Sequence, residues 1–265
     1  MASPITTKGD IEQGVHIENA NSQVPDGPIM LTREQYARLF LEPGGRTPSV
    51  QKFANPTPFC VICFLLSLSP TSCILLAWGE ADTSSLVSIV GPFYFIGGLG
   101  MIIGGAMEWI LGNTFPFVVF STFGGFWLAL GVLQDPMHAV ASAFTATGGL
   151  ASPALNSGLM FYFAFWGAIC FIYFIASLRT HCVFAFILGT LVFGFACLSA
   201  GYGRLAKGDA DAALDLIKAA GGFTFATSLA GFYLAFALIF GCVGMPIELP
   251  LGDLSGRLFK KKNTN

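Results

Sequence analysis

One carboxylate stands out in a sequence that is poor in charge. Glu108 lies within a long apolar stretch, four residues before the turn signal Gly112-Asn113-Thr114. A charge in hydrocarbon costs about 2.5 kcal/mol or more, so this side chain must face a cavity, a partner or the membrane interface. Its position, about one helical turn from the end of the stretch, favours a turn-bracing or interfacial role. Proton coupling stays open as the alternative.

A polar group also begins the first apolar stretch. Asn55-Pro56-Thr57-Pro58 places two prolines where a helix starts, and proline suits a first helical turn because its missing N–H would be unpaired there. Asn55 can cap that turn, and the unpaired N–H groups of a helix start suit a small anion. The residues alone leave two interpretations open: an anion-binding helix start, or an ordinary membrane helix beginning at the lipid boundary.

The other reactive side chains form no catalytic or metal-binding pattern. Cys60 and Cys63 form a C-x-x-C inside the first apolar stretch, where cysteines are typically small apolar fillers rather than a redox or zinc pair. The sequence holds no Ser-His-Asp set, no H-E-x-x-H and no carboxylate pair on one helical face. We therefore expect no enzyme, no cofactor and no metal site.

The elements that must position these groups are long and apolar. Hydrophobic residues make up 54% of the chain and charged residues 11%, against about 25% charged in soluble domains. Apolar tracts of about 20 residues, the length of a helix that crosses a bilayer, recur along the chain. They predict an all-α integral membrane protein with six transmembrane helices, at about residues 57–78, 87–111, 115–134, 158–178, 182–202 and 220–243. The net charge of -2, without a basic stripe, argues against a nucleic-acid partner.

These spans divide the chain into three parts. Residues 1–52 are predicted to be a mostly disordered N-terminal tail with a short amphipathic helix at about 31–42. Residues 53–245 are predicted to form the transmembrane domain, and residues 246–265 a C-terminal tail.

The distribution of basic residues predicts the orientation. An even number of spans puts both tails on one side, and the tails carry most of the Lys and Arg, so we expect a multi-pass protein with both termini in the cytoplasm. The opposite side carries only Arg204, Lys207 and Lys218. Before the sixth span, Asp209, Asp211 and Asp215 are spaced for a helix start.

Several blocks, in order, resemble one transport family, the acetate uptake transporters or succinate–acetate permeases, in their fungal branch. Asn55-Pro56-Thr57-Pro58 is similar to the N-P-A-P signature of that family, and Glu108-Trp109 with Gly112-Asn113-Thr114-Phe115 resembles its E…GNTFG block. Phe120-Ser121-Thr122-Phe123-Gly124 with Phe126-Trp127 resembles its FTSYGxFW block. Trp166-Gly167 and Gly231-Phe232-Tyr233 also fit. The resemblance covers about residues 53–245.

This resemblance implies a six-helix protomer with its own central pore, assembled as a homo-hexamer. By position it assigns the aromatic–leucine–tyrosine constriction of the family to Phe64, Leu191 and Phe123, the last in place of tyrosine. The resemblance implies a substrate path that comprises Asn55, Thr57, Met101, Glu108, Asn113, Thr114 and Trp166.

Three departures from the family pattern change the expected path. Phe123 lacks the hydroxyl of the tyrosine, Met101 stands where the family usually has glutamine, and Phe59 replaces the leucine after N-P-A-P. We expect all three to make the path bulkier or more apolar. A dry constriction raises the cost of desolvating an anion by several kcal/mol. Either a protonated acid passes, or this chain has another substrate.

The leading hypothesis is a plasma-membrane permease or channel for small monocarboxylates such as acetate, with succinate as a further candidate. Its partners would be the carboxylate, protons and the lipid bilayer, and the proton gradient would drive uptake by symport or by passage of the protonated acid. The alternatives are a channel for a small neutral solute such as ammonia, urea or water, and a non-transporting membrane scaffold or sensor.

Overall fold

The computed structural model describes residues 53–254, so the predicted tail over residues 1–52, with its helix at about 31–42, and residues 255–265 lie outside the described residues. Within the described part, six helices are long and apolar enough to cross a membrane. They are α2 (Thr57–Leu75), a composite second span (Thr83–Ile110), α5 (Thr114–Gln134), α6 (Pro153–Ser177), α7 (Cys182–Leu205) and α8 (Ala210–Cys242). The predicted all-α, six-span fold is confirmed.

α6 and α8 start furthest ahead of the residues at which hydropathy predicts a helix start. α6 starts at Pro153 instead of residue 158, and α8 starts at Ala210 instead of residue 220. Asp209 caps α8, its Oδ1 accepting a hydrogen bond from the backbone N–H of Ala212 at 3.3 Å, which confirms the helix start predicted from the aspartates. The early turns escaped prediction because their polar residues lower the apolar average without preventing a helix.

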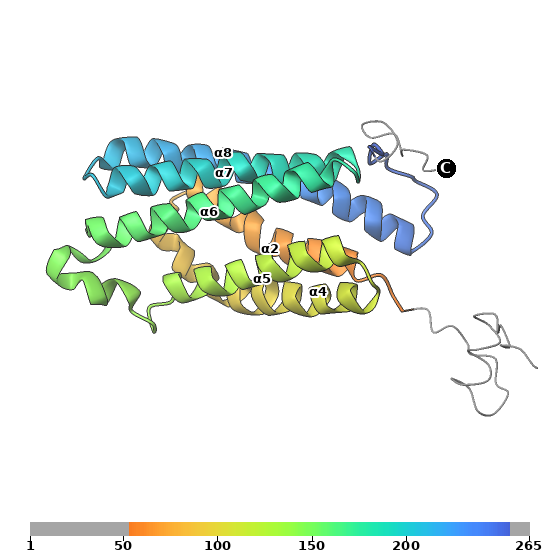
Figure 1. Cartoon of the computed structure of the whole chain (residues 1–265), viewed down its shortest axis with the longest axis horizontal. Helices are drawn as coiled ribbons and strands as arrows, with labels where there is room; N and C mark the ends of the chain where they lie inside the picture. The colour runs from red at the N-terminus through yellow and green to blue at the C-terminus, as the bar shows by residue number, and fades with distance from the viewer. Residues whose placement is uncertain (1–52, 255–265) are drawn as a thin grey trace, which may run out of the picture. The chain divides into compact units, whose positions relative to one another are not determined.

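The helices alternate in direction along the bundle (Figure 1). α7 packs along both α6 and α8, α2 packs along α8, and α4 (Met101–Ile110), the last part of the second span, packs along α5. α2, α5 and α7 begin at one end of the bundle, which we call the proximal end, whereas α6 and α8 begin at the opposite, distal end. Residues near the middle of α2, α5 and α7 can therefore meet at one depth.

The second span is not one continuous α-helix. It comprises three segments before α4: η2, a 3-10 helix (Thr83–Ile89), the short α3 (Val90–Pro92) and η3, a π-helix (Phe93–Gly100). Proline has no N–H to donate, so Pro92 interrupts the helical hydrogen bonding, and the wider π turns accommodate that break. η3 also places Phe93 against Trp127 of α5, with stacked rings whose centroids are 5.2 Å apart.

Gly221 lies where α8 crosses α2 at close range. A Cβ added at Gly221 would lie 2.9 Å from the backbone nitrogen of Leu76 and 3.0 Å from the carbonyl carbon of Leu75. Backbone atoms cannot rotate away as a side chain can, so glycine is needed for this approach. The next residue, Gly222, meets nothing within 4 Å.

The segment that follows α8 packs at the proximal end, where α8 finishes. The backbone N–H of Cys182 donates to the carbonyl of Gly252 at 2.7 Å, and the N–H of Leu254 donates to the carbonyl of Thr180 at 2.9 Å. The described part of the tail predicted over residues 246–265 thus packs against the connection between α6 and α7.

We expect Gly221→Ala to lower the free energy of unfolding by about 1–3 kcal/mol, because the added methyl group overpacks the crossing of α2 and α8. Thermal unfolding of the detergent-solubilised protein measures the change. Gly222→Ala is the matched control, and we expect it to be neutral or stabilising by up to about 1 kcal/mol, because alanine favours helices more than glycine does. Equal losses in the two variants would contradict the close crossing.

Candidate functional site

Three cavities share walls inside the bundle. The largest, of about 390 Å³, lies at the distal end, and we call it the distal vestibule. An inner cavity of about 60 Å³ shares lining residues with it, among them Leu86, Leu130 and Leu198. A proximal cavity of about 30 Å³ is lined by residues that include Met101 and Val119. The shared lining indicates a path from the distal vestibule through the inner cavity towards the proximal cavity.

Three side chains form the wall between the inner and the proximal cavity. Of the residues that the structure describes, only Phe64 of α2, Phe123 of α5 and Leu191 of α7 line both cavities. All three are buried. The rings of Phe64 and Phe123 meet edge to face, with centroids 5.8 Å apart. The structure therefore brings together the three residues to which the family resemblance assigns the constriction.

Aromatic packing holds Phe123 in this wall. The ring of Trp166, from α6, lies 5.6 Å from that of Phe123 and 5.0 Å from that of Phe126, measured between centroids. Trp166 is not among the residues that line the three cavities. It therefore supports the wall from outside the path.

The three residues that depart from the family pattern, Phe123, Met101 and Phe59, lie at different positions relative to the cavities. Phe123 lies in the wall, and Met101, only 1% exposed, lines the proximal cavity. Phe59 is 45% exposed, and its ring lies beside Gly100 and Gly104, where α2 meets the second span. The expectation that Phe59 narrows the path is therefore wrong.

At the proximal end, Glu108 accepts hydrogen bonds from α2 and from the residue that precedes α5. The hydroxyl of Thr57 donates to its Oε1 at 2.5 Å, and the side-chain amide of Asn113 donates to its Oε2 at 2.6 Å. Glu108 is completely buried by protein atoms, and the bond from Asn113 agrees with the turn-bracing interpretation. Its depth relative to the membrane interface stays a prediction. Asn55 joins this network because its Oδ1 accepts a hydrogen bond from the backbone N–H of Thr57 at 3.0 Å.

Apart from Trp166, which lies outside the path, the predicted substrate-path residues fall into two groups. Met101 lies at the proximal cavity, and Glu108 follows it by seven residues of α4, or about 10 Å along a helix. Thr114 is exposed at the start of α5. None of the proximal polar residues lines one of the three cavities; these residues are Asn55, Thr57, Glu108, Asn113 and Thr114.

The polar lining of the distal vestibule was not predicted from the sequence. Gln134 and Asp135 contribute to it at the end of α5, and Asn156 contributes from α6. The Asp135-Pro136 pair is a turn signal, which places it between two spans. Nothing in the local sequence indicates that this turn borders a cavity.

The six helices and their connections also match one protein family. The model of the GPR1/FUN34/yaaH family matches residues 39–254. The chain belongs to the GPR1/FUN34/yaaH family. This membership confirms the resemblance to the acetate uptake transporters that the sequence blocks indicated.

Members of the GPR1/FUN34/yaaH family and their relatives are similar over most of the chain. Protein alcS of Aspergillus fumigatus is 36% identical over 264 residues, 93% of this chain and 97% of its own. The acetate transporter protein patA of Aspergillus clavatus is 31% identical over 221 residues, 83% of this chain and 85% of its own. The structure of the bacterial acetate channel SatP matches with a TM-score of 0.58 and 25% identity, covering 76% of this chain and 100% of SatP. The chain is thus a multi-pass membrane protein of a transporter and channel family.

We expect Glu108→Ala to lower the free energy of unfolding by about 1–3 kcal/mol, because the donors of Thr57 and Asn113 lose their acceptor. Thermal unfolding in detergent measures the loss. Glu80→Ala is the control, since Glu80 is exposed in the connection after α2, and a surface change of this kind stays within about 0.5 kcal/mol. A similar stability for both variants would contradict the bracing role.

The pH dependence of uptake by the Glu108→Gln variant distinguishes a bracing role of Glu108 from a role in proton coupling. An amide keeps the shape of the side chain but cannot ionise. If Glu108 couples protons, the folded variant loses the dependence of uptake on the pH gradient. If Glu108 only braces the turn, that dependence remains.

Proposed function

We propose that this protein is a permease or channel for small monocarboxylates such as acetate, with succinate as a further candidate substrate. The observation that carries the proposal is the wall of Phe64, Phe123 and Leu191, which divides two cavities within a single protomer. The names of two similar proteins, the acetate transporter patA and the acetate channel SatP, support the substrate class.

The lining of the path favours the protonated acid over its anion. The inner and proximal cavities are lined mainly by aliphatic and aromatic side chains. Desolvating an ionised carboxylate without replacing its hydrogen bonds costs far more than desolvating the neutral acid. A proton gradient would therefore drive uptake, either by symport or by supplying the protonated acid on one side.

The outer surface supports a membrane location and an assembly. Large apolar side chains are exposed along α6, with Phe161 at 59%, Phe165 at 72% and Ile172 at 61%. Such faces contact lipid or neighbouring subunits. We propose a homo-hexamer in the plasma membrane, with both termini cytoplasmic and one path in each protomer.

Reconstitution into liposomes tests this function. We expect labelled acetate to enter under an imposed pH gradient faster than it enters protein-free vesicles, which also leak the neutral acid. Leu191→Trp is the matched blocked variant, because the larger ring fills the wall. Uptake that is the same in wild-type, blocked and protein-free vesicles would rule out the substrate class.

Phe123→Tyr tests the wall itself. We expect carboxylate uptake to rise about threefold to tenfold, because the added hydroxyl replaces one hydrogen bond of the passing carboxyl group, worth about 0.5–1.5 kcal/mol. Phe186→Tyr is the control, since Phe186 is 52% exposed on α7, and its uptake should equal that of the wild type. An unchanged rate in Phe123→Tyr would count against the wall as the limiting step.

A channel for a small neutral solute is the second candidate, and the apolar wall favours it because neutral solutes cross such a wall at lower cost. Stopped-flow measurements of vesicle volume with urea, ammonia or water test it in the same liposomes. A flux that Leu191→Trp blocks, in vesicles that show no acetate uptake, would replace the leading proposal.

A further inference from the structure

The distal vestibule holds a single charged side chain among the described residues that line it. This is Asp135, at the end of α5. The other polar groups of the lining are neutral, and they include Gln134, Asn156 and Ser84. A carboxylate anion that enters this vestibule therefore meets a negative charge and no lysine or arginine of the lining.

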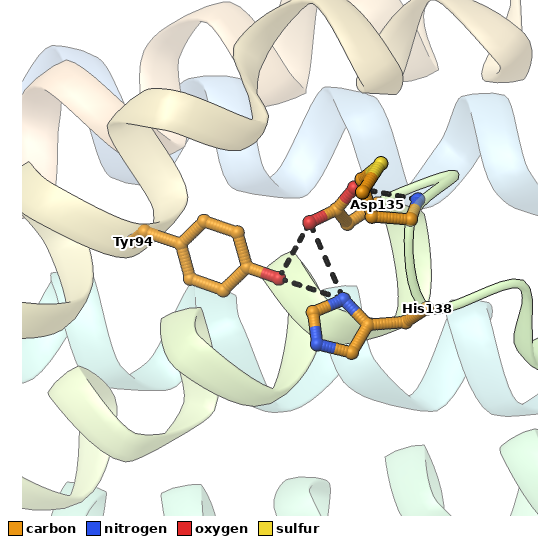
Figure 2. Close-up of polar contacts among 4 residues, drawn as sticks. Tyr94, Asp135 and His138 are labelled. Atoms are coloured by element: carbon orange, nitrogen blue, oxygen red, sulfur yellow. Dashed lines mark hydrogen bonds and ion pairs between the residues drawn. The ribbon is translucent and has the colours of Figure 1, made fainter.

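Three groups contact the carboxylate of Asp135: a hydroxyl, an imidazole nitrogen and a backbone N–H (Figure 2). The hydroxyl of Tyr94, from η3, donates to its Oδ2 at 3.1 Å, and the Nδ1 of His138 lies 3.3 Å from the same oxygen. The backbone N–H of Met137 donates to Oδ1 at 2.9 Å. Tyr94 and His138 also contact each other, with 3.3 Å between the hydroxyl and Nδ1. The carboxylate is thus fixed in one orientation at the vestibule.

The local sequence builds this arrangement. Asp135-Pro136 ends α5, and the backbone N–H of His138 donates to the carbonyl of Asp135 at 3.1 Å, which turns the imidazole back onto the carboxylate. Gly131, one helical turn earlier, leaves room for Tyr94, since a Cβ at Gly131 would lie 2.9 Å from the tyrosine ring. The π-helix of the second span brings Tyr94 to this position.

The carboxylate stays ionised. The N–H of Met137 lowers the pKa of Asp135, opposed by desolvation and reinforced by Tyr94 and His138. The titratable groups that contact His138 are Asp135 on its own connection and Tyr94 on the second span. From α7, Tyr202 is the further titratable residue among the described vestibule lining. The side chain of His138 is 47% exposed.

Building on the proposed function, we propose that Asp135 is a charge filter that keeps carboxylate anions out of the distal vestibule and so selects the protonated acid. Like charges repel, and the described lining holds no lysine or arginine that would offset this repulsion. A carboxylate anion is therefore less concentrated in the vestibule than in the solution at the distal end.

The test is the acetate current across a planar bilayer that contains the reconstituted protein, with the reversal potential in an acetate gradient identifying the anion. At about pH 7.5 a carboxylic acid such as acetate is almost fully ionised. We expect the wild-type current to be small there, because the filter keeps most of the anion out of the vestibule. Labelled acetate uptake by liposomes, measured in parallel, reports the neutral acid as well.

Asp135→Asn separates the charge from the bracing role. The amide keeps the acceptor for Met137 but removes the charge, so its acetate current should be about threefold to tenfold larger than that of the wild type. Replacing a carboxylate that only braced the turn would not raise the current. Asp209→Asn, at the same end and still a good helix cap, should behave as wild type.

The outcomes are distinguishable from a failure of the proposed function. If wild-type protein gives neither acetate uptake nor acetate current above protein-free membranes, the proposed function fails. If uptake is present but Asp135→Asn has the same acetate current as the wild type, the filter is overturned. An equal rise in Asp209→Asn would overturn it too, because general surface charge would then explain the effect.

Discussion

An apolar wall between two cavities is the constraint on which this structure depends. Phe64, Phe123 and Leu191 come from three helices that begin at the same end, and they meet between two cavities. A wall of this kind works only if the three helices keep their depth relative to one another. A shift of one turn, about 5.4 Å, would replace each of these side chains with another.

Close helix contacts beside the wall fix that depth. Leu65 follows Phe64, and its Cδ2 would lie 2.7 Å from a Cβ at Gly231 of α8. Gly124 follows Phe123, and a Cβ there would lie 2.9 Å from the carbonyl oxygen of Gly98 in the second span. Lipid provides no hydrophobic drive for helices to associate, so such close packing has to hold them together. The small residues and the wall residues therefore depend on each other.

The sequence predicted the spans but not the details that depend on packing. Hydropathy is sufficient for six helices because each must cover the bilayer with apolar side chains. It cannot distinguish an α-helix from the π-helix of η3, since both are equally apolar, and that break decides where Tyr94 lies. The wall was predicted from family resemblance by position, and no periodicity in the sequence marks it.

The distance of Glu108 from the end of its helix was a poor guide to the burial of its side chain. Glu108 was expected near a surface because it lies about one turn from the helix end. Thr57, far away in the sequence, covers it from α2, and the carboxylate is completely buried. The turn-bracing bond from Asn113 was predictable because both partners flank one turn, whereas the bond from Thr57 needed the packing of α2 against α4.

The two carboxylates show that hydrogen bonding alone does not reveal a role in transport. Glu108 and Asp135 each have partners on both oxygens. The hydrogen bonds of Glu108 join α2 and α4 to the start of α5. Glu108 lines none of the three cavities, so its charge acts on the fold. Asp135 faces a cavity, and a charge beside an apolar path changes which ions approach it. Contact with a cavity, more than the count of bonds, separates the carboxylate that braces the fold from the one for which we propose a role in selectivity.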